Sequence, residues 1–465
     1  MYYRLSDSVA LRSWKYVDYA CYLKNESFAR RLSKTEFETA MLCDGEHDLK
    51  ETETVKLLLK DRMIVACNKG DRLSDWSVYK EYPNRYFPRM SIMLTGKCNY
   101  NCLHCFNAAD NAPLSSEWEY EDLLDLLDQA DECGLHAFTL TGGEPMLHPH
   151  FLDILREIYR RNMMVFEINT NGYYITPRIL DEMKALGCSP LIKISFDGIG
   201  CHDTIRGHKG AEQKTLDAIG LCKKYRFRVE AQTQVNKLTL PSLVPTARLL
   251  DEMGVDIMRL LRTTEVARLE KTSPGIVIPM EDYYDEMIRF AGEYAKSGIN
   301  MKLYIWMLAN LYPDRKNYSI IPVKSLPENF SPTSPICRDI RSMIGIASDG
   351  EVAPCLQMTG TMTERAVHFA NVHDTKLSTI LSEGPYFDMV CCNMYKFKEN
   401  TPKCASCRHF KYCSGGCPAF SMLYSDKKAD YFNPDITKCL FWDNGFYERI
   451  TEIMGDDWIN LTKIR

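Results

Sequence analysis

Membrane-spanning segments, an excess of positive charge and low-complexity tracts are all missing from this sequence of 465 residues. No apolar run approaches the roughly 20 residues that a membrane-spanning helix needs, and the first residues do not place a basic segment before an apolar one. The formal net charge is -5, with Lys and Arg spread among Asp and Glu. These absences predict a cytoplasmic protein without a membrane anchor and without nucleic acid as its main partner.

Cysteine, by contrast, is abundant, with 19 residues in the chain. The cytoplasm keeps thiols reduced, so grouped cysteines in such a protein indicate metal ligation and not disulfides. A chain of this length also has room for several domains, because single hydrophobic cores stop growing well below it. The positions of the cysteines therefore decide how the sequence is interpreted.

Residues 1–86 have a short, mixed pattern that predicts a winged-helix-like domain. Ser33 and Glu36 form a capping box at the start of a helix that Gly45 ends. Strands are expected at residues 9–14, 19–23 and 63–66, and a second helix at 51–59. Pro83 marks the start of a linker to the next domain.

Residues 87–325 alternate short apolar runs with longer amphipathic segments, which is the pattern of repeated strand–helix units around a parallel sheet. Strands are predicted at residues 91–94, 137–140, 164–168, 191–194, 229–233 and 257–261. Six such units predict an α/β fold that forms an open or three-quarter barrel and not the closed eightfold form. Ligands of such sheets bind at the carboxyl ends of the strands, where the motifs of this domain lie.

Three cysteines follow the first of these strands in the pattern C-x3-C-x2-C, formed by Cys98, Cys102 and Cys105. Three thiolates on one short loop can converge on one iron–sulfur cluster and leave one of its irons without a protein ligand. The alternative for the triad alone is a zinc site that lacks its fourth ligand. The following motifs favour the cluster.

The triad, followed one unit later by Gly142, Gly143 and Glu144 in T-G-G-E-P, resembles the radical S-adenosylmethionine (SAM) superfamily. The resemblance implies a partial (β/α)6 barrel, a 4Fe-4S cluster on the triad and SAM bound to the open iron. It further implies that His104 lies near the adenine, and that the turn at residues 142–144 receives the SAM amino group. Glycines in such a turn let the backbone approach a ligand closely.

Small polar residues end the next two strands, in T-N-G and S-F-D-G. The resemblance implies that Asn171, Ser195 and Asp197 face the ribose or carboxylate of SAM, with Ser195 the stronger candidate. Arg206 lies in H-D-T-I-R-G, which resembles a stretch of peptide-modifying members, and could pair with a carboxylate of SAM or substrate. The alternative for Arg206 is an exposed loop residue.

The remaining segment, residues 326–465, is divided by cysteines and glycines and has little regular periodicity. Its order of cysteines resembles the SPASM domain of peptide- and cofactor-maturing radical SAM families, whereas a zinc ribbon would account for only one C-x2-C pair. The resemblance implies two further 4Fe-4S clusters, and hence three in the chain. Their ligands would be Cys337, Cys355 and Cys417 for the inner cluster and Cys404, Cys407, Cys413 and Cys439 for the outer one.

The inner cluster departs from part of the family, because no further cysteine follows Cys337 closely. Its fourth iron is therefore either open or bound by a borrowed ligand. Cys391 and Cys392 lie nearby in the sequence, although a packed pair of small side chains is the simpler interpretation. The seven other cysteines are interpreted as ordinary core or surface residues.

The first domain resembles the precursor-recognition element of ribosomal peptide maturases in its layout and in residues 40–45, A-M-L-C-D-G. Such an element binds an extended leader peptide as an added strand. The hypothesis is a maturase that abstracts hydrogen from a precursor peptide and forms a crosslink, with a flavodoxin- or ferredoxin-type protein as reductant. A cysteine thioether is the leading product, ahead of carbon–carbon or ether crosslinks and epimerisation.

Two alternatives belong to other classes. An anaerobic sulfatase-maturating enzyme normally carries Asp after its second auxiliary cysteine, where this chain has Leu356, and it would leave the first domain unexplained. A non-catalytic iron–sulfur electron carrier would need neither the glycine turn at 142–144 nor Ser195. A generic winged helix remains the alternative for the first domain itself.

Overall fold

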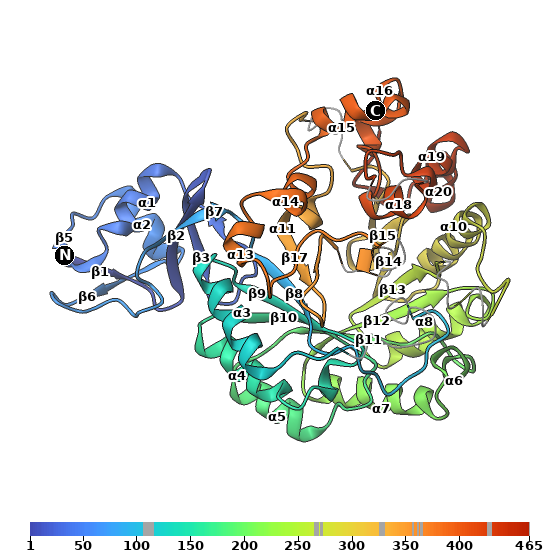
Figure 1. Cartoon of the computed structure of the whole chain (residues 1–465), viewed down its shortest axis with the longest axis horizontal. Coiled ribbons are helices and arrows are strands. Elements are labelled where there is room, and N and C mark those ends of the chain that lie inside the picture. Colours follow the sequence, from blue (N-terminus) through green and yellow to red (C-terminus); the bar gives the residue numbers. More distant parts are fainter. Residues whose placement is uncertain are drawn as a thin grey trace.

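A sheet of 12 strands forms the body of the protein in the computed structural model (Figure 1). The structure describes all residues except 106–115, 265–268, 270–272, 325–330, 356–357, 360–361, 363–365, 426–429 and 465. Parallel pairing runs without interruption through β8 Arg89–Met93, β9 Ala137–Thr141, β10 Met164–Thr170, β11 Leu191–Ser195, β12 Arg228–Val235, β13 Ile257–Arg262 and β14 Lys302–Ile305. All six predicted strands are therefore confirmed, and the sheet is that of a partial barrel.

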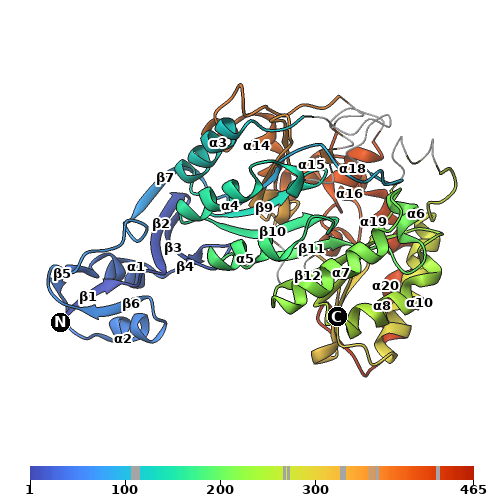
Figure 2. The ribbon, with the colours of Figure 1, turned by 90° about the horizontal axis from the view of Figure 1, so that it is seen from below.

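Helices follow these strands and cover one face of the sheet, as both views show (Figure 2). They are α3 Tyr120–Glu132, α4 Phe151–Arg160, α5 Pro177–Ala185, α6 His202–Arg206, α7 Ala211–Lys224, α8 Leu243–Glu252 and α10 Met280–Lys296, with the 3-10 turns η2 Pro145–Leu147 and η3 Leu240–Ser242. Alternate strand residues such as Ile192, Ile194 and Val229 are fully buried in the main core. Side chains alternate between faces along a strand, which is why every second residue is apolar.

The residues between them carry charge and pair across neighbouring strands. Lys193 Nζ lies 2.8 Å from Glu167 Oε1, and Arg259 Nε lies 2.6 Å from Glu230 Oε1. Glu230 is buried, so its carboxylate requires such a partner. The sheet thus has an apolar face under the helices and a polar, charged opposite face.

The C-terminal part of the chain extends this sheet at both edges. At one edge lie β15 Ala309–Tyr312, β16 Asn317–Ile320 and β19 Ile459–Asn460, with η4 Pro313–Arg315 between the first two. At the other edge, β17 Met343–Ile346 pairs in parallel with β8, and β18 Val352–Ala353 follows it. The predicted boundary at residues 325 and 326 lies outside the described residues.

Short helices fill the rest of this part: α11 Arg338–Ser342, α13 Leu377–Ile380, α14 Gly384–Val390, α15 Met394–Asn400, α16 Pro402–Ala405, α17 Phe410–Cys413, α18 Pro418–Leu423, α19 Ile436–Asp443 and α20 Phe446–Met454. Residues 436–454 are divided between α19 and α20, because Gly445 adopts φ 68° between them. A left-handed residue cannot continue a right-handed helix.

The N-terminal residues form a separate lobe at the side of the barrel (Figure 1). One sheet has the order β5-β1-β6 and the other β4-β3-β2-β7. The elements are β1 Tyr2–Leu5, β2 Val9–Lys15, β3 Val17–Leu23, β4 Arg30–Arg31, α1 Lys34–Met41, β5 Asp44–Asp48, α2 Glu53–Lys60, β6 Ile64–Cys67 and β7 Lys80–Arg85. The capping box at Ser33 and Glu36 is confirmed, but Gly45 lies within β5, and the helix ends at Met41.

This lobe is docked on the barrel through the segment between α3 and β9. Tyr22 donates a hydrogen bond from its hydroxyl to the carbonyl of Gly134 at 3.0 Å. The same Tyr22 ring stacks on His136, with ring centroids 4.4 Å apart. Burial lowers the pKa of His136 to about 3, so this imidazole is neutral. The Tyr22–His136 contact is consequently uncharged near neutral pH.

Candidate functional site

The three cysteines that follow β8 lie together in the structure. Cys98, Cys102 and Cys105 belong to one small cluster with Tyr100 and Ala211. The backbone amide of Tyr100 lies 3.4 Å from Cys98 Sγ, so the loop curls around this sulfur. The predicted triad is thus gathered on one turn at the carboxyl end of the first barrel strand.

The glycine turn at residues 142–144 holds one side of this loop. The amides of Gly143 and Glu144 donate to the carbonyls of Thr95 at 2.7 Å and Lys97 at 2.9 Å. A Cβ atom on Gly143 would lie only 2.2 Å from the Lys97 carbonyl oxygen. Glycine is required here because any side chain would push the cysteine loop away from β9.

The other side of the loop rests on the end of α6. The amide of Asn101 donates to the carbonyl of Arg206 at 3.1 Å, and that of Leu103 donates to Ile205 at 2.9 Å. A Cβ atom on Gly207 would approach the Asn101 carbonyl oxygen to 2.4 Å. The H-D-T-I-R-G stretch therefore supports the cysteine loop through its backbone, which its sequence did not indicate.

Glu144 is fully buried and ties the ends of two strands together. Its carboxylate accepts hydrogen bonds from Thr170 Oγ1 and from the Asn171 amide, both at 2.8 Å. Burial raises the pKa of Glu144 to about 7. A cationic ammonium group placed beside this carboxyl would favour its charged form. The site thus suits the amino group that the sequence resemblance implies there.

Arg206 and Asp197 form a buried ion pair behind the loop. Arg206 Nε lies 2.7 Å from Asp197 Oδ2, and Nη2 donates to Oδ1 at 3.2 Å. Arg206 Nη1 lies 3.7 Å from Cys102 Sγ. Burial alone would raise the pKa of Asp197, but the charge of Arg206 and the hydrogen bond with His202 hold it well below its usual range.

The carboxylate that Arg206 contacts in the structure is therefore the one on Asp197, whereas the sequence suggested one from SAM or substrate. Asp197 is also engaged on its other side, because the Gln234 amide donates to its Oδ1 at 3.0 Å. His104 lies close enough to Asp197 for its charge to lower the pKa of that carboxyl. Arg206 is a buried residue and not the exposed loop residue of the alternative.

Two further predicted residues end neighbouring strands. Asn171 follows β10 and donates from Nδ2 to Asn99 Oδ1 at 2.8 Å, with Cys98 Sγ at 3.9 Å. Ser195 ends β11 and is paired in register with Gln232 of β12. The cysteine loop, the glycine turn and these strand ends thus meet at one edge of the sheet.

Two polar groups of this region are buried without a hydrogen-bond partner among the described residues, namely the Tyr100 hydroxyl and Asn99 Nδ2. Buried polar atoms are usually hydrogen-bonded, so such atoms indicate a bound group. Together with three thiols on one loop, they fit an iron–sulfur cluster with an associated polar cofactor.

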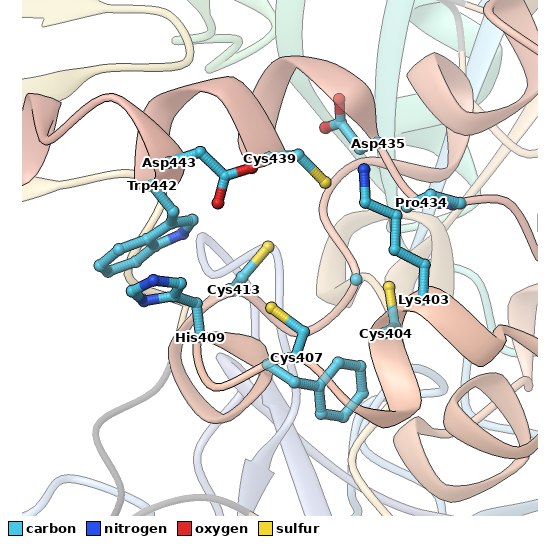
Figure 3. Close-up of a pocket in the computed structure, with 12 residues that line it drawn as sticks. Lys403, Cys404, Cys407, His409, Cys413, Pro434, Asp435, Cys439, Trp442 and Asp443 are labelled. Atoms are coloured by element: carbon cyan, nitrogen blue, oxygen red, sulfur yellow. The ribbon is translucent and has the colours of Figure 1, made fainter.

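A second group of cysteines surrounds a cavity in the C-terminal part (Figure 3). Cys404, Cys407, Cys413 and Cys439 direct their sulfur atoms toward its centre, and the cavity measures about 100 Å³. A single water needs only about 10–15 Å³ by this measure. The cavity therefore has room for a multi-atom group, and its four thiols match the four predicted outer-cluster ligands.

The glycine pair before Cys417 shapes the neighbouring inner site. Gly416 adopts φ +80°, and a Cβ there would approach Asp435 Cβ to 2.3 Å. The Cys417 amide donates to Asp435 Oδ2 at 2.9 Å. Burial raises the pKa of Cys417 to about 11, with Asp435 and Cys337 acting in the same direction, so Cys337 and Cys417 are neighbours.

The C-terminal part contains three further cysteines, Cys355 and the adjacent pair at 391 and 392. Cys355 is half-buried and packs against the main core. Cys392 is 2% exposed, and its Sγ lies 3.6 Å from the carbonyl oxygen of Asn393, as expected for a packed thiol. Leu356, which argued against the sulfatase-maturating alternative, lies outside the described residues.

The described residues contain no group of three or more His, Cys, Asp or Glu side chains placed to hold a single metal ion. A 4Fe-4S cluster binds each cysteine through a different iron, so its ligands do not need to converge on one point. The thiol groups described above are therefore compatible with iron–sulfur clusters.

Comparison with known families agrees with this geometry. Residues 92–242 match the radical SAM superfamily, and residues 337–408 match the SPASM iron-sulfur cluster-binding domain. The chain therefore contains a radical SAM domain and a SPASM domain. Its fold places a SAM-binding domain and an iron–sulfur domain on one continuous sheet.

Relatives of this chain carry names that refer to different substrates and products. An AdoMet-dependent heme synthase of Methanosarcina barkeri is 32% identical over 35% of this chain. The match spans only 46% of the length of that relative. The PqqA peptide cyclase of Gluconobacter oxydans is 23% identical over 74% of this chain and 89% of its own length. These matches therefore support the domain composition and leave the substrate to be proposed.

The structure of Streptococcus suis SuiB bound to the precursor peptide SuiA has the same fold, with a TM-score of 0.63 and 14% identity. The alignment covers 94% of this radical SAM enzyme and 99% of SuiB, so the likeness includes the N-terminal lobe. Within the described part of this enzyme, no helix has the length and apolar character needed to cross a membrane.

Proposed function

We propose that this radical SAM enzyme matures a ribosomally made precursor peptide by hydrogen abstraction and crosslink formation, with a cysteine thioether as the product. The observation that carries the proposal is the fold that 94% of this chain shares with SuiB, whose structure contains the precursor peptide SuiA. The peptide cyclase and the mycofactocin maturase among its relatives support the same substrate class.

We assign the first cluster to Cys98, Cys102 and Cys105, and the SAM pocket to the glycine turn at 142–144 with Asn171 and Ser195. SAM and the cluster together supply the radical that removes a hydrogen atom from the peptide. Glu144 orients the amino group of SAM through its buried carboxylate, while Asp197 and Arg206 hold the cysteine loop. The charged face of the sheet, with Lys193 and Arg259, offers polar contacts for the peptide backbone.

We further assign two auxiliary clusters to the SPASM domain, which brings the total to three. The inner one would be held by Cys337, Cys355 and Cys417, which leaves one iron for a substrate thiolate. The outer one would be held by the four thiols around the cavity of Figure 3. Its assigned ligand Cys407 is exposed, so electrons would pass between this cluster and a redox partner.

The direct test is co-expression with a short, cysteine-containing reading frame encoded beside the gene. A thioether requires the loss of two hydrogen atoms per crosslink, and the crosslinked cysteine should no longer react with iodoacetamide. A precursor whose mass does not change, or one that changes while every cysteine stays reactive, would exclude the thioether assignment.

We propose that the leader binds as a strand along β4 of the N-terminal lobe. The Leu32 amide donates to the Tyr19 carbonyl at 2.9 Å, so in this antiparallel pair the amide of the preceding Arg31 points away from β3. Arg30 of β4 forms an ion pair of 3.8 Å with Asp61 at the end of α2. β4 is the outermost strand of its sheet and lies near α2, whose Leu57 is exposed.

Replacing Arg31 by proline should weaken binding of the full-length precursor by about tenfold or more, because a missing hydrogen bond costs about 0.5–1.5 kcal/mol and the ring blocks strand addition. SAM cleavage without precursor should not change. Fluorescence anisotropy with a labelled leader measures the affinity. The variant Arg31→Ala keeps the amide and separates the loss of charge from the loss of the donor.

If Arg31→Pro and Arg31→Ala both bind the leader as tightly as the unmodified enzyme, β4 is not the docking edge. If both lose affinity to the same extent, the Arg31 side chain and not the strand edge makes the contact. Deleting residues 1–86 is a coarser test, because it would also expose the surface that carries His136.

We propose that an acidic flavodoxin or ferredoxin docks near Cys407. Residues 396–411 carry five exposed cationic residues against one acid, Glu399, in a chain whose net charge is -5. The cations are Lys396, Lys398, Lys403, Arg408 and Lys411. Such a local reversal of charge favours an acidic partner and speeds its encounter.

Replacing Lys398 and Lys411 by glutamate should therefore slow reduction by a reduced flavodoxin by about tenfold at low salt. Stopped-flow flavin absorbance follows the electron transfer, and turnover with dithionite should stay unchanged. The matched control is Lys34→Glu with Lys56→Glu, two exposed lysines of the N-terminal lobe. Equal slowing by both pairs would place the docking surface elsewhere.

A further inference from the structure

Lys324 contacts the backbone next to three candidate cluster ligands. Its Nζ donates to the carbonyl of Ile336 at 3.0 Å and to the carbonyl of Gly416. Its backbone amide donates to the carbonyl of Tyr412 at 2.8 Å. These three acceptors directly precede Cys337, Cys417 and Cys413 in the chain. Lys324 therefore contacts the backbone beside assigned ligands of both auxiliary sites.

A buried lysine and a buried aspartate complete the connection. Asp435 is 1% exposed, receives the Cys417 amide at Oδ2 and receives the Thr437 amide at Oδ1 at 3.0 Å. Lys438 is 5% exposed and donates from Nζ to the carbonyl of Met307 at 2.9 Å. Two lysines and one aspartate thus lie between the inner and outer cysteines, which leaves one excess positive charge there.

We propose that Lys324 and Lys438 are positioning residues that join the two auxiliary cluster sites and raise the reduction potential of the inner cluster. The proposal rests on the cluster assignments made under the proposed function. Lys324 fixes Cys337 and Cys417 relative to each other through its two carbonyl contacts. Lys438 adds charge without contacting the backbone beside a ligand of the inner site.

The direction of the effect follows from elementary electrostatics. Reduction adds a negative charge to a cluster, and a fixed positive charge nearby stabilises the reduced state. Screening by water is weak because Lys438 is buried and Lys324 is partly buried.

A higher potential suits the electron balance of thioether formation. SAM cleavage takes one electron from the first cluster, and the hydrogen atom removed from the peptide ends in 5'-deoxyadenosine. When the peptide radical forms its bond with the thiolate sulfur, one electron is left over. An oxidised inner cluster held by Cys337, Cys355 and Cys417 would accept this electron, and the outer cluster would then carry it toward a redox partner.

The test uses the full chain with Cys98, Cys102 and Cys105 replaced by alanine, so that only auxiliary clusters remain. This parent should hold about eight irons. In it, Lys324→Met and Lys438→Met should each lower the potential of the inner cluster, so that the reduced fraction falls about tenfold at a fixed potential, which for one electron is about 59 mV. Iron content should stay near the parent value, and an EPR-monitored redox titration measures the shift.

Lys324→Arg keeps the charge and should stay near the parent potential, and Lys34→Met, at an exposed lysine of the N-terminal lobe, should do the same. An unchanged potential in both methionine variants would overturn the proposal. If Lys324→Met does not fold, Lys438→Met decides the electrostatic claim alone. A parent without auxiliary iron would instead refute the cluster assignments, so the two failures are distinguishable.

Discussion

Replacing Cys98, Cys102 and Cys105 by alanine should remove about four irons per chain and abolish 5'-deoxyadenosine formation completely. The loss should be total because these three thiols are the assigned ligands of the cluster that supplies the electron to SAM. The fold should persist, since the loop is also held by backbone bonds to the glycine turn and to α6. Iron and sulfide analysis after anaerobic reconstitution, with chromatography of the nucleoside product, measures both effects.

The matched control is the triple replacement of Cys133, Cys188 and Cys222 by alanine. These cysteines are buried in the core away from any assigned cluster site, and their thiols have no proposed ligand role. Removing them costs packing, and therefore stability, but the chain should keep about twelve irons. A triad variant that still cleaves SAM would show that the first cluster has been assigned to the wrong cysteines.

Replacing Cys355 by alanine should abolish the peptide crosslink while uncoupled SAM cleavage continues. The inner cluster has only three assigned cysteines, so it has an iron that can take a soft thiolate ligand from the substrate. Without Cys355 this cluster loses a ligand, whereas the first cluster and the glycine turn at 142–144 remain. Mass spectrometry of the precursor and measurement of 5'-deoxyadenosine separate the two activities.

The same interpretation predicts a spectroscopic change in the unmodified enzyme. Adding precursor should alter the spectrum of the auxiliary clusters, and a precursor with serine in place of its cysteines should leave it unaltered. If neither precursor changes the spectrum, the inner cluster is fully ligated and only transfers electrons. In that case Cys392 would become the candidate for the borrowed fourth ligand, despite its buried, packed position.

The sequence by itself located the strands of the barrel and the cysteines of the assigned clusters. Every predicted strand between residues 91 and 261 appears in the structure with boundaries shifted by at most two residues. This success has a local cause, because alternating apolar runs and the pattern C-x3-C-x2-C are properties of neighbouring residues. The capping box at Ser33 was equally local and equally visible.

The tertiary structure alone decided what the polar residues contact. The sequence predicted that Arg206 pairs with a carboxylate of SAM or substrate, yet in the structure it pairs with Asp197. Glu144, which follows β9, accepts hydrogen bonds from the end of β10. No sequence pattern pointed to Lys324, because the two partners of its side chain lie 12 and 92 residues further along the chain. Contacts between distant segments depend on how the sheet brings them together, and no periodicity along the chain records that.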